Sequence, residues 1–459
     1  MERKHLLDLV GKCFVGCQRA LVVGLGAAAA AFWICCAPMA ARAAGLYRDG
    51  SSASSMGLGG NTVAGADNPL DAMETNPATL SDIRGPTLQT SVIGADAEGV
   101  FHNRVNAHSV LGQDGLLGNV GAATAAGPWH FGFSVNPEIA LAAQWRYRDA
   151  PGGLDGHTSY GVQPQDSGIV VVRLAFGASW DVNPQLSLGA SVGLLYNQNH
   201  MRTPYVFQTQ PALRNVKTLF DLDTDGVGVD GQVGLLWKPL EALQLGLSYR
   251  TPSRVVTDGQ ATGNAGVQLA NLGLGAARHD FNYDATVTNV FPQQVNTGFA
   301  WKVTGRLTAL AEMDWINWAN AFDTLPVHLK GGKNALLNEL VGSRNLYDHV
   351  PLDWRNQFVW RLGAEYALDD HWRLRIGYAS ARSSVPADTL TPLTASIPEN
   401  ILTAGIGYRR DRLSIDLAYQ FELPETERVG RTALAAGEYS NSSVRIEEQW
   451  LSLTTTIGF

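Results

Sequence analysis

The chain has 459 residues, a formal charge of −8 at pH 7, and only 17% charged residues. Soluble domains carry about 25% charged residues, so this composition is unusual for a water-soluble protein of such length. The acidic balance also argues against a nucleic-acid partner, because nucleic acids bind basic surfaces.

The first 43 residues predict a signal peptide. Four basic residues lie within the first 19 positions, and an uncharged run rich in Ala, Val, Leu and Gly follows at 20–41. The run closes on Ala41-Arg42-Ala43, an arrangement of small residues typical of a secretory cleavage site. The alternative is an uncleaved membrane anchor, because the apolar run is just long enough to span a bilayer. All four cysteines lie at positions 13–36, so cleavage after Ala43 would leave a chain without disulfides or cysteine metal ligands.

Residues 44–85 show no alternation of apolar and polar residues and are rich in Gly, Ser, Asn and Ala. Small residues allow tight turns and close packing in a confined space. The other interpretation is a disordered tail, which the same composition would also allow.

From residue 86 onward, apolar residues alternate with small or polar residues, which predicts β-strands. Between Val170 and Trp180 the even positions are apolar, whereas Arg173 and Ser179 occupy the other face. The strands are expected near 86–96, 116–125, 129–147, 167–182, 186–196, 227–237, 243–250, 295–303, 306–318, 356–367, 372–381, 401–409, 413–422 and 451–459.

The two faces of these strands predict lipid on one side and a lumen on the other. Most apolar faces end in Trp or Tyr, as at Trp237 and Tyr378, which is typical of strands that cross a membrane. The opposite faces carry charges such as Arg173 and Asp230, which can pair in a lumen but remain unexplained in a soluble sandwich. Short and long links alternate, as periplasmic turns and extracellular loops do. We therefore expect an all-β fold, a 14-stranded antiparallel transmembrane β-barrel at residues 86–459.

Several short motifs resemble catalytic, nucleotide-binding or calcium-binding sequences but lack the surrounding elements that such sites need. Residues 189–193 match a serine-hydrolase elbow and 226–231 a dinucleotide loop, yet both fall within alternating strands. Asp221, Asp223 and Asp225 begin like a calcium loop, but its twelfth position is Gln232, which cannot supply a bidentate carboxylate. We expect no catalytic residue, no cofactor and no metal ligand, with a weak surface calcium site left open.

Several segments, in their order along the chain, resemble the FadL family of outer-membrane fatty-acid transporters. The first are Ser51-Ser52-Ala53-Ser54-Ser55-Met56-Gly57 and Asn76-Pro77-Ala78; later ones include Leu247-Ser248-Tyr249-Arg250-Thr251, Trp315-Ile316-Asn317-Trp318 and Leu374-Arg375-Ile376-Gly377-Tyr378. The resemblance implies that residues 44–85 form an N-terminal plug (hatch) inside the lumen, with Asn76, Pro77 and Ala78 as its motif. One departure is Asp67-Asn68-Pro69-Leu70-Asp71, where the family more often has an acidic pair.

The resemblance also implies a function, namely passive transport of long-chain fatty acids or other hydrophobic small molecules across the cell outer membrane. The protein would be a monomer that contacts outer-membrane lipid and lipopolysaccharide and is inserted by the barrel-assembly machinery. A channel of the same fold for aromatic hydrocarbons or alkanes is the alternative. A general porin and an outer-membrane barrel hydrolase are further alternatives, and no paired nucleophile and base supports the hydrolase.

Two long loops carry apolar residues at near-helical spacing, which predicts short amphipathic helices that contact the ligand. Leu213 and Phe220 lie in the loop at 198–225, and Leu337 and Leu340 in the loop at 319–353.

A buried carboxylate ligand would need a cation near it. The resemblance places one loosely at Arg202, beside Met201, with His349 as a helper.

The expected third strand is interrupted by Asn136-Pro137. Proline has no N–H to complete a strand ladder, so it predicts a kink or bulge. In the resembled family the corresponding strand leaves a side opening in the barrel wall, and we therefore expect Asn136 and Pro137 to form a lateral opening that the plug motif faces.

Overall fold

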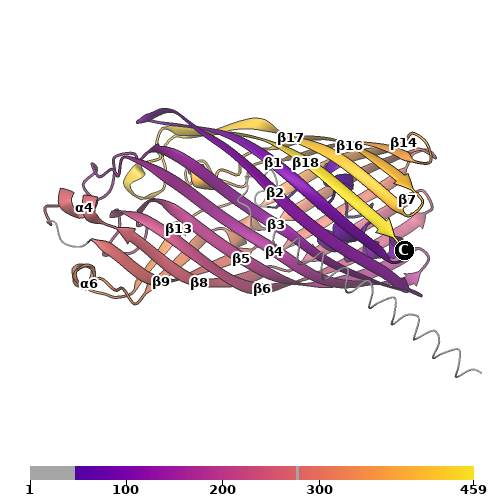
Figure 1. Ribbon diagram of the computed structural model, residues 1–459, viewed down its shortest axis with the longest axis horizontal. Coiled ribbons are helices and arrows are strands. Elements are labelled where there is room, and N and C mark those ends of the chain that lie inside the picture. Colours follow the sequence, from indigo (N-terminus) through magenta and orange to yellow (C-terminus); the bar gives the residue numbers. More distant parts are fainter. Residues whose placement is uncertain (1–46, 275–278) are drawn as a thin grey trace, which may run out of the picture.

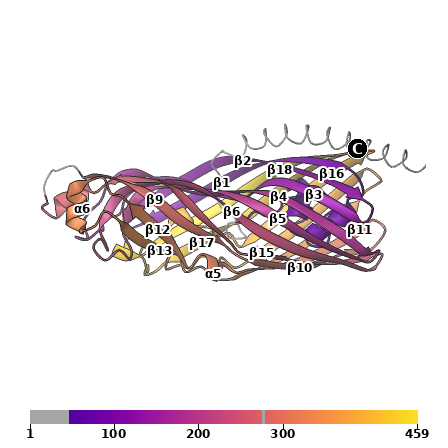
Figure 2. The same ribbon diagram turned by 90° about the horizontal axis from the view of Figure 1, so that it is seen from below.

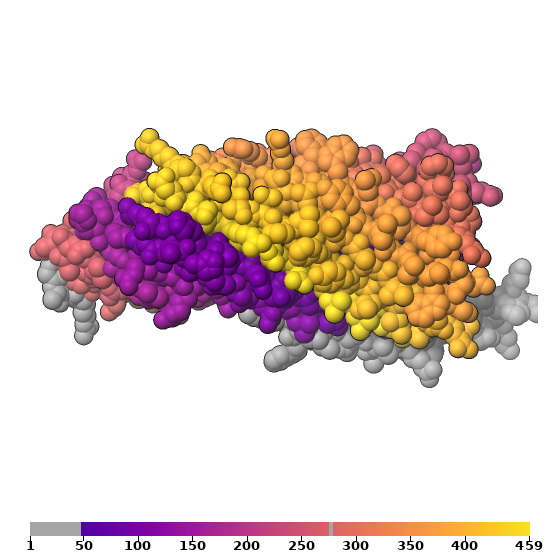
Figure 3. Space-filling model, turned by 90° about the horizontal axis from the view of Figure 1, so that it is seen from above, coloured from indigo at the N-terminus to yellow at the C-terminus, as the bar shows by residue number. Residues whose placement is uncertain are grey.

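The fold is a closed barrel (Figure 1). The computed structural model describes residues 47–274 and 279–459, so the expected signal peptide at 1–43 lies outside the described residues. Within the described part of the chain, eighteen strand segments form one antiparallel sheet, and β18 (Ser442–Gly458) pairs with β1 (Thr87–Asn103) to close it. Figure 3 shows this seam, where the indigo first strands lie against the yellow C-terminal strands.

The eighteen segments of the described chain make up fourteen barrel strands, which confirms the predicted number. Ten are single segments: β1, β2 (Asn106–Ala126), β3 (Trp129–Arg148), β4 (Val162–Asn183), β5 (Leu186–Val206), β6 (Lys217–Leu240), β15 (Trp372–Ala381), β16 (Asn400–Arg410), β17 (Leu413–Val429) and β18. The other four are each divided in two: β7 (Leu243–Arg250) with β8 (Ser253–Asn264), β9 (Asp280–Phe291) with β10 (Gln294–Lys302), β11 (Leu307–Ile316) with β12 (Thr324–Lys330), and β13 (Leu346–Pro351) with β14 (Gln357–Ala367).

The outer face follows the predicted alternation. Outward residues such as Val192, Val229 and Ile376 are more than 60% exposed, whereas their polar neighbours along the strand face inward and are buried. Near the end with the short turns, Trp129 stacks on Trp180 with ring centroids 5.9 Å apart. This pattern is that of a lipid-facing wall with an aromatic girdle.

The inner face carries charges that are paired. The Arg173 guanidinium lies 2.9 Å from Asp230, Arg250 lies 2.9 Å from Glu138, and Arg375 lies 2.6 Å from Asp416. Because breaking a buried pair leaves an uncompensated charge, such pairs fix the register of the strands that bear them.

Short helices lie in the N-terminal segment and in the long loops. They are α2 (Ala53–Gly57), α3 (Pro69–Glu74), η1 (Pro77–Asp82), α4 (Gly266–Asn271), α5 (Trp318–Ala321), α6 (Ala335–Val341), η2 (Pro392–Thr394) and η3 (Ala435–Gly437). Among the described residues, none of these helices is long and apolar enough to cross a membrane. In Figures 1 and 2, α6 lies at one end of the barrel and the C-terminus lies toward the other.

One of the two predicted loop helices forms. Leu337 and Leu340 lie on α6, as expected. The helix expected at 213–220 is wrong, because β6 begins at Lys217 and pairs with β5 as far as Val206. Phe220 packs its ring 5.2 Å from that of Tyr205, so the aromatic residues of this stretch are used across paired strands rather than along a helix.

The third strand departs from the regular ladder. β3 pairs with β4 along its whole length, with a bulge between Pro137 and Ile139. Its ladder with β2 covers only Trp129 to Val135. Beyond that point the main chain of Arg48 donates to Glu138 and a bridge joins Tyr47 to Ile139. Asn136 and Pro137 therefore lie where β3 separates from β2.

Candidate ligand-binding cavity

An apolar cavity of about 160 Å³ lies between the barrel wall and the long loops. Its walls come from β3, β4, β5, β6, β9, β12 and β13, and its remaining sides come chiefly from the loops at 382–399 and 430–441. Apolar side chains dominate the lining, among them Leu141, Tyr205, Leu222, Val327, Leu352 and Leu393.

Tyr205 is positioned by a cluster of aromatic rings and by one carboxylate. Its ring lies 5.4 Å from Phe207 and 5.2 Å from Phe220. Its hydroxyl donates to Asp348, at 2.6 Å, and the backbone N–H groups of Gln208 and Thr209 donate to the same carboxylate. The buried Asp348 thus ties the β5–β6 loop to β13 and fixes one wall of the cavity.

Below the cavity the lumen becomes polar. A hollow of about 50 Å³ is lined by Arg48, Glu138, Arg250, Glu312 and Arg361. A larger one of about 340 Å³, toward the short turns, is lined by side chains such as Asp71, Glu241 and Lys302. An apolar ligand is therefore more stable in the upper cavity than in the charged layer below it.

Residues 47–85 occupy this charged layer. Asn76 is fully buried; its carboxamide oxygen accepts from Ala78 N–H, and its NH₂ donates to the carbonyls of Val63 and Leu235. Pro77 and Ala78 lie against Gly189 of β5, where an added Cβ would overlap their main chain. The three residues of the motif therefore join the N-terminal segment to the inner face of β5 and β6.

The segment at 67–71, where the sequence departs from the resembled family, also has a structural role. Asn68 caps α3 by accepting from the N–H of Asp71. The Asp71 carboxylate in turn accepts from the hydroxyls of Ser51, Ser52 and Ser55. These contacts close the N-terminal segment on itself around one buried carboxylate.

The structure places only Met201, among the seven expected ligand residues, in the lining of the cavity. Arg202 is exposed and lies opposite Asp221 and Asp166 in the strand register. The other five do not line the cavity. Leu213, Phe220 and Leu337 pack in the aromatic cluster beside it, Leu340 is half exposed, and His349 lies against Tyr347.

Several lining residues had no distinct signal in the sequence. Leu434, Glu438 and Tyr439 come from the β17–β18 loop, and Thr389 and Leu393 from the β15–β16 loop. These loops have no periodic pattern, so only the fold brings them to the cavity.

Glu438 belongs to a buried ionic cluster. Its carboxylate lies 2.8 Å from the Lys217 ammonium, which lies 2.6 Å from Asp149 and donates to the carbonyl of Ala150. Burial raises the pKa of Glu438 to about 7, and Lys217 opposes this rise. Burial also raises the pKa of Asp149. The β3–β4 and β17–β18 loops therefore meet the start of β6 at one fully buried ammonium.

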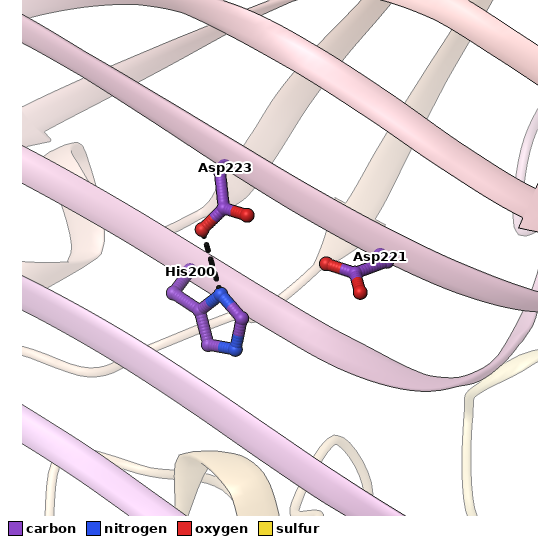
Figure 4. Close-up of side chains that lie close together, drawn as sticks. All are labelled: His200, Asp221 and Asp223. Carbon is purple, nitrogen blue, oxygen red and sulfur yellow. Dashed lines mark hydrogen bonds and ion pairs between the residues drawn. The ribbon is translucent and has the colours of Figure 1, made fainter.

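A second polar cluster lies on the outer wall, above the lipid-facing stretch of β5 and β6. His200 Nδ1 lies 2.7 Å from Asp223, and the ligand atoms of His200, Asp221 and Asp223 lie within 4.8 Å of one another (Figure 4). The calcium loop considered at 221–232 does not form, because these residues lie within β6 and a strand cannot wrap around an ion. The elbow-like and dinucleotide-like motifs likewise lie within β5 and β6.

Comparisons with known proteins agree with this architecture. A family model described as "Outer membrane protein transport protein (OMPP1/FadL/TodX)" matches residues 34–457. Among curated proteins, none matches the chain.

Solved structures share the fold at low identity. A Pseudomonas aeruginosa FadL homologue is 18% identical, with 90% of this chain and 100% of that chain covered and a TM-score of 0.73. The Pseudomonas putida toluene transporter TodX is 20% identical, with 90% and 100% covered and a TM-score of 0.71. The Ralstonia pickettii toluene transporter TbuX is 21% identical, with 90% and 99% covered and a TM-score of 0.67.

Proposed function

Because the chain belongs to the OMPP1/FadL/TodX family of outer-membrane transport proteins, we propose that it is a passive channel for hydrophobic molecules about the size of one aromatic ring. The observation that carries the proposal is the apolar cavity of about 160 Å³. An apolar cavity of about 150 Å³ is large enough to bind benzene. A long-chain fatty acid has several times more carbon atoms than benzene and would not fit without rearrangement of the walls.

Weak binding suits such a role. Burying a side chain of the size of Phe contributes about 1.5–3 kcal/mol, whereas a millimolar dissociation constant corresponds to about 4 kcal/mol. A single-ring hydrocarbon would therefore bind with a dissociation constant in the millimolar range or above. Such a ligand leaves quickly, so a concentration gradient is enough to drive net transport.

Filling the cavity tests this proposal. Leu222 lines the cavity from β6, so a Leu222→Trp variant should reduce uptake of radiolabelled toluene by cells that carry no other channel of this kind. The matched control is Val229→Trp on the same strand, because Val229 faces outward and is 65% exposed. Oleate uptake that is faster than toluene uptake and equally sensitive to Leu222→Trp would contradict the proposed ligand size.

We further propose that residues 47–85 act as the plug and that the ligand leaves sideways. The charged layer around Arg48, Glu138 and Arg250 offers an apolar molecule no favourable path along the barrel axis. Leu141 and Leu393 line the main cavity and also a small apolar hollow bounded by Ala97, Leu111 and Ala143. That hollow lies beside the stretch where β3 has separated from β2, next to Asn136 and Pro137.

A bulky side chain in this hollow should stop transport. Ala143→Trp is expected to lower toluene uptake at least tenfold while toluene still binds to the detergent-solubilised protein. Ala190→Trp on the outward face of β5 is the control, because Ala190 is exposed. Normal uptake by a folded Ala143→Trp variant would show that the ligand takes another route.

A further inference from the structure

The cavity contains one charged side chain. Of the described residues that line it, only Glu438 is an Asp, Glu, Lys or Arg. Glu438 is buried, with 7% of its surface exposed, and it comes from the β17–β18 loop. A ligand in the cavity therefore meets an acidic group and no guanidinium or ammonium group.

The carboxylate is held in place by groups outside the cavity lining. One oxygen accepts from the N–H of Gly153 at 3.2 Å, and the other lies 2.8 Å from the Lys217 ammonium. An added Cβ at the neighbouring Gly152 would overlap the carboxylate, so the loop packs directly against it. These contacts fix the carboxylate, so the position of the Glu438 side chain in the cavity wall is fixed as well.

The ionic cluster is not neutral when all its groups are ionised. Lys217 is shared between Glu438 and Asp149, so two carboxylates face one ammonium. Lys217 does not line the cavity, and its ammonium is also occupied by the carbonyl of Ala150. It therefore offers a ligand no direct pairing.

The remaining titratable groups do not replace a cation. His200 also lines the cavity, but its ring is hydrogen-bonded to Asp223 on the outer face. The phenol of Tyr160 donates to main-chain carbonyls, one of them that of Lys217. An anion entering the cavity would lose its water shell without gaining a charged partner, which is unfavourable in an apolar site.

We infer that Glu438 sets the charge selectivity of the cavity, so that uncharged hydrophobic molecules enter and anionic ones of the same shape are excluded. This inference rests on the proposed function and specifies the chemical class of its substrate. Like charges that are separated by a few ångströms in a medium of low dielectric repel each other strongly. An uncharged ring meets neither this repulsion nor the cost of desolvating an anion.

The test compares benzoate with benzamide, which has the same shape and no charge, at pH 8, with toluene as the reference substrate. The measured quantity is channel-dependent uptake, the difference between cells with and without the protein. In the wild-type protein, benzoate uptake should be at most one tenth of benzamide uptake. Glu438→Gln preserves the shape of the side chain and should raise the benzoate-to-benzamide ratio at least tenfold.

Two further variants make the result decisive. Glu339→Gln is the control, because Glu339 is exposed on α6 and does not line the cavity, and the ratio should stay unchanged. Asp149→Asn removes the carboxylate that lies outside the lining and should raise the ratio by a smaller factor. It also provides a second measurement if Glu438→Gln does not assemble.

Failure of the inference and failure of the proposed function give different results. Equal uptake of benzoate and benzamide by the wild-type protein would overturn the inference while toluene uptake still supported the proposed function. A ratio that stays low in both Glu438→Gln and Asp149→Asn would show that Glu438 is not the selecting group. Absence of toluene uptake by the wild-type protein would overturn the proposed function, and the inference would fall with it.

Discussion

Replacing Lys217 by Met should release the β17–β18 loop from the top of the cavity. The Lys217 ammonium is fully buried and is the group that joins Asp149 after β3 to Glu438 in the loop at 430–441. Methionine fills a similar volume but leaves both carboxylates without their cation. Lys217 is the first residue of β6 and the two carboxylates lie in loops, so the loop should open without unfolding of the barrel.

The size of the effect follows from the burial of the cluster. Removing one partner of a buried ion pair costs about 3–5 kcal/mol, and about 1.4 kcal/mol corresponds to a factor of ten. The open population of the loop should therefore rise between about a hundredfold and a few thousandfold at pH 8.

The pKa of Glu438 is raised to about 7, so Glu438 holds its proton more tightly in the closed loop than in the open loop. The contribution of Glu438 protonation to closure is therefore fully present below a pH of about 4.5 and is lost progressively as the pH rises toward 7. The penalty of Lys217→Met should accordingly shrink at pH 5, where the Glu438 carboxyl group is largely neutral in the closed loop.

Thiol labelling measures this opening. All four cysteines of the sequence lie at positions 13–36, so Ala435→Cys in a chain that begins after residue 43 provides a single reporter beside the cavity. Its labelling rate, divided by the rate for the unfolded chain at the same pH, gives the open population. Glu438→Gln in the Lys217→Met background should recover part of the protection. Equal labelling rates at pH 8 in the parent protein and in the Lys217→Met variant would refute the idea that the cluster holds the loop closed.

Three further variants test the packing around the cavity and the N-terminal segment. Gly189→Val should reduce the folded fraction seen by heat-dependent gel mobility, because its Cβ would overlap the main chain of Ala78; a normal folded yield would contradict the close contact between them. Asn76→Ala should lower the unfolding free energy by about 1–3 kcal/mol, since it leaves buried main-chain groups without partners; an unchanged urea midpoint would count against that role. Tyr205→Phe should cost about 1.5–3 kcal/mol, because it removes a hydrogen bond to the carboxylate of Asp348, and a double-mutant cycle with Asp348→Asn should show that the two effects are not additive.

The membrane-crossing part of the barrel could be predicted because lipid imposes one rule on every strand. Residues such as Val192 and Val229 must be apolar where they face lipid, whereas their neighbours face a polar lumen, so the period of two is strict. The number of strands follows from this pattern and from the alternation of short and long links. The division of four strands into two segments could not be predicted from the sequence pattern, since each break between two segments occupies only a few residues.

The long-loop end could not be predicted in the same way, because part of its wall is covered by protein on both faces. Residues 136–143 of β3 are buried on both faces, so burial there no longer alternates. In the same region the spacing of apolar residues at 213–220 predicts a helix, although the stretch contains the start of β6. The lining of the cavity gives little signal for a related reason, since Glu438 and Thr389 stand in loops without any period.

The change of polarity along the lumen links the cavity to the irregular third strand. A molecule that is stable beside Leu222 and Leu352 would have to displace paired charges such as Arg250 and Glu138 to continue along the axis. Breaking a buried pair costs about 3–5 kcal/mol, which exceeds the roughly 1.5–3 kcal/mol that burial of a single ring contributes. Passage between β2 and β3 breaks no ladder hydrogen bond beyond Val135, where their ladder has already ended. This balance supports the proposed exit through the wall over passage along the axis, with residues 47–85 held among the charged side chains of the lumen.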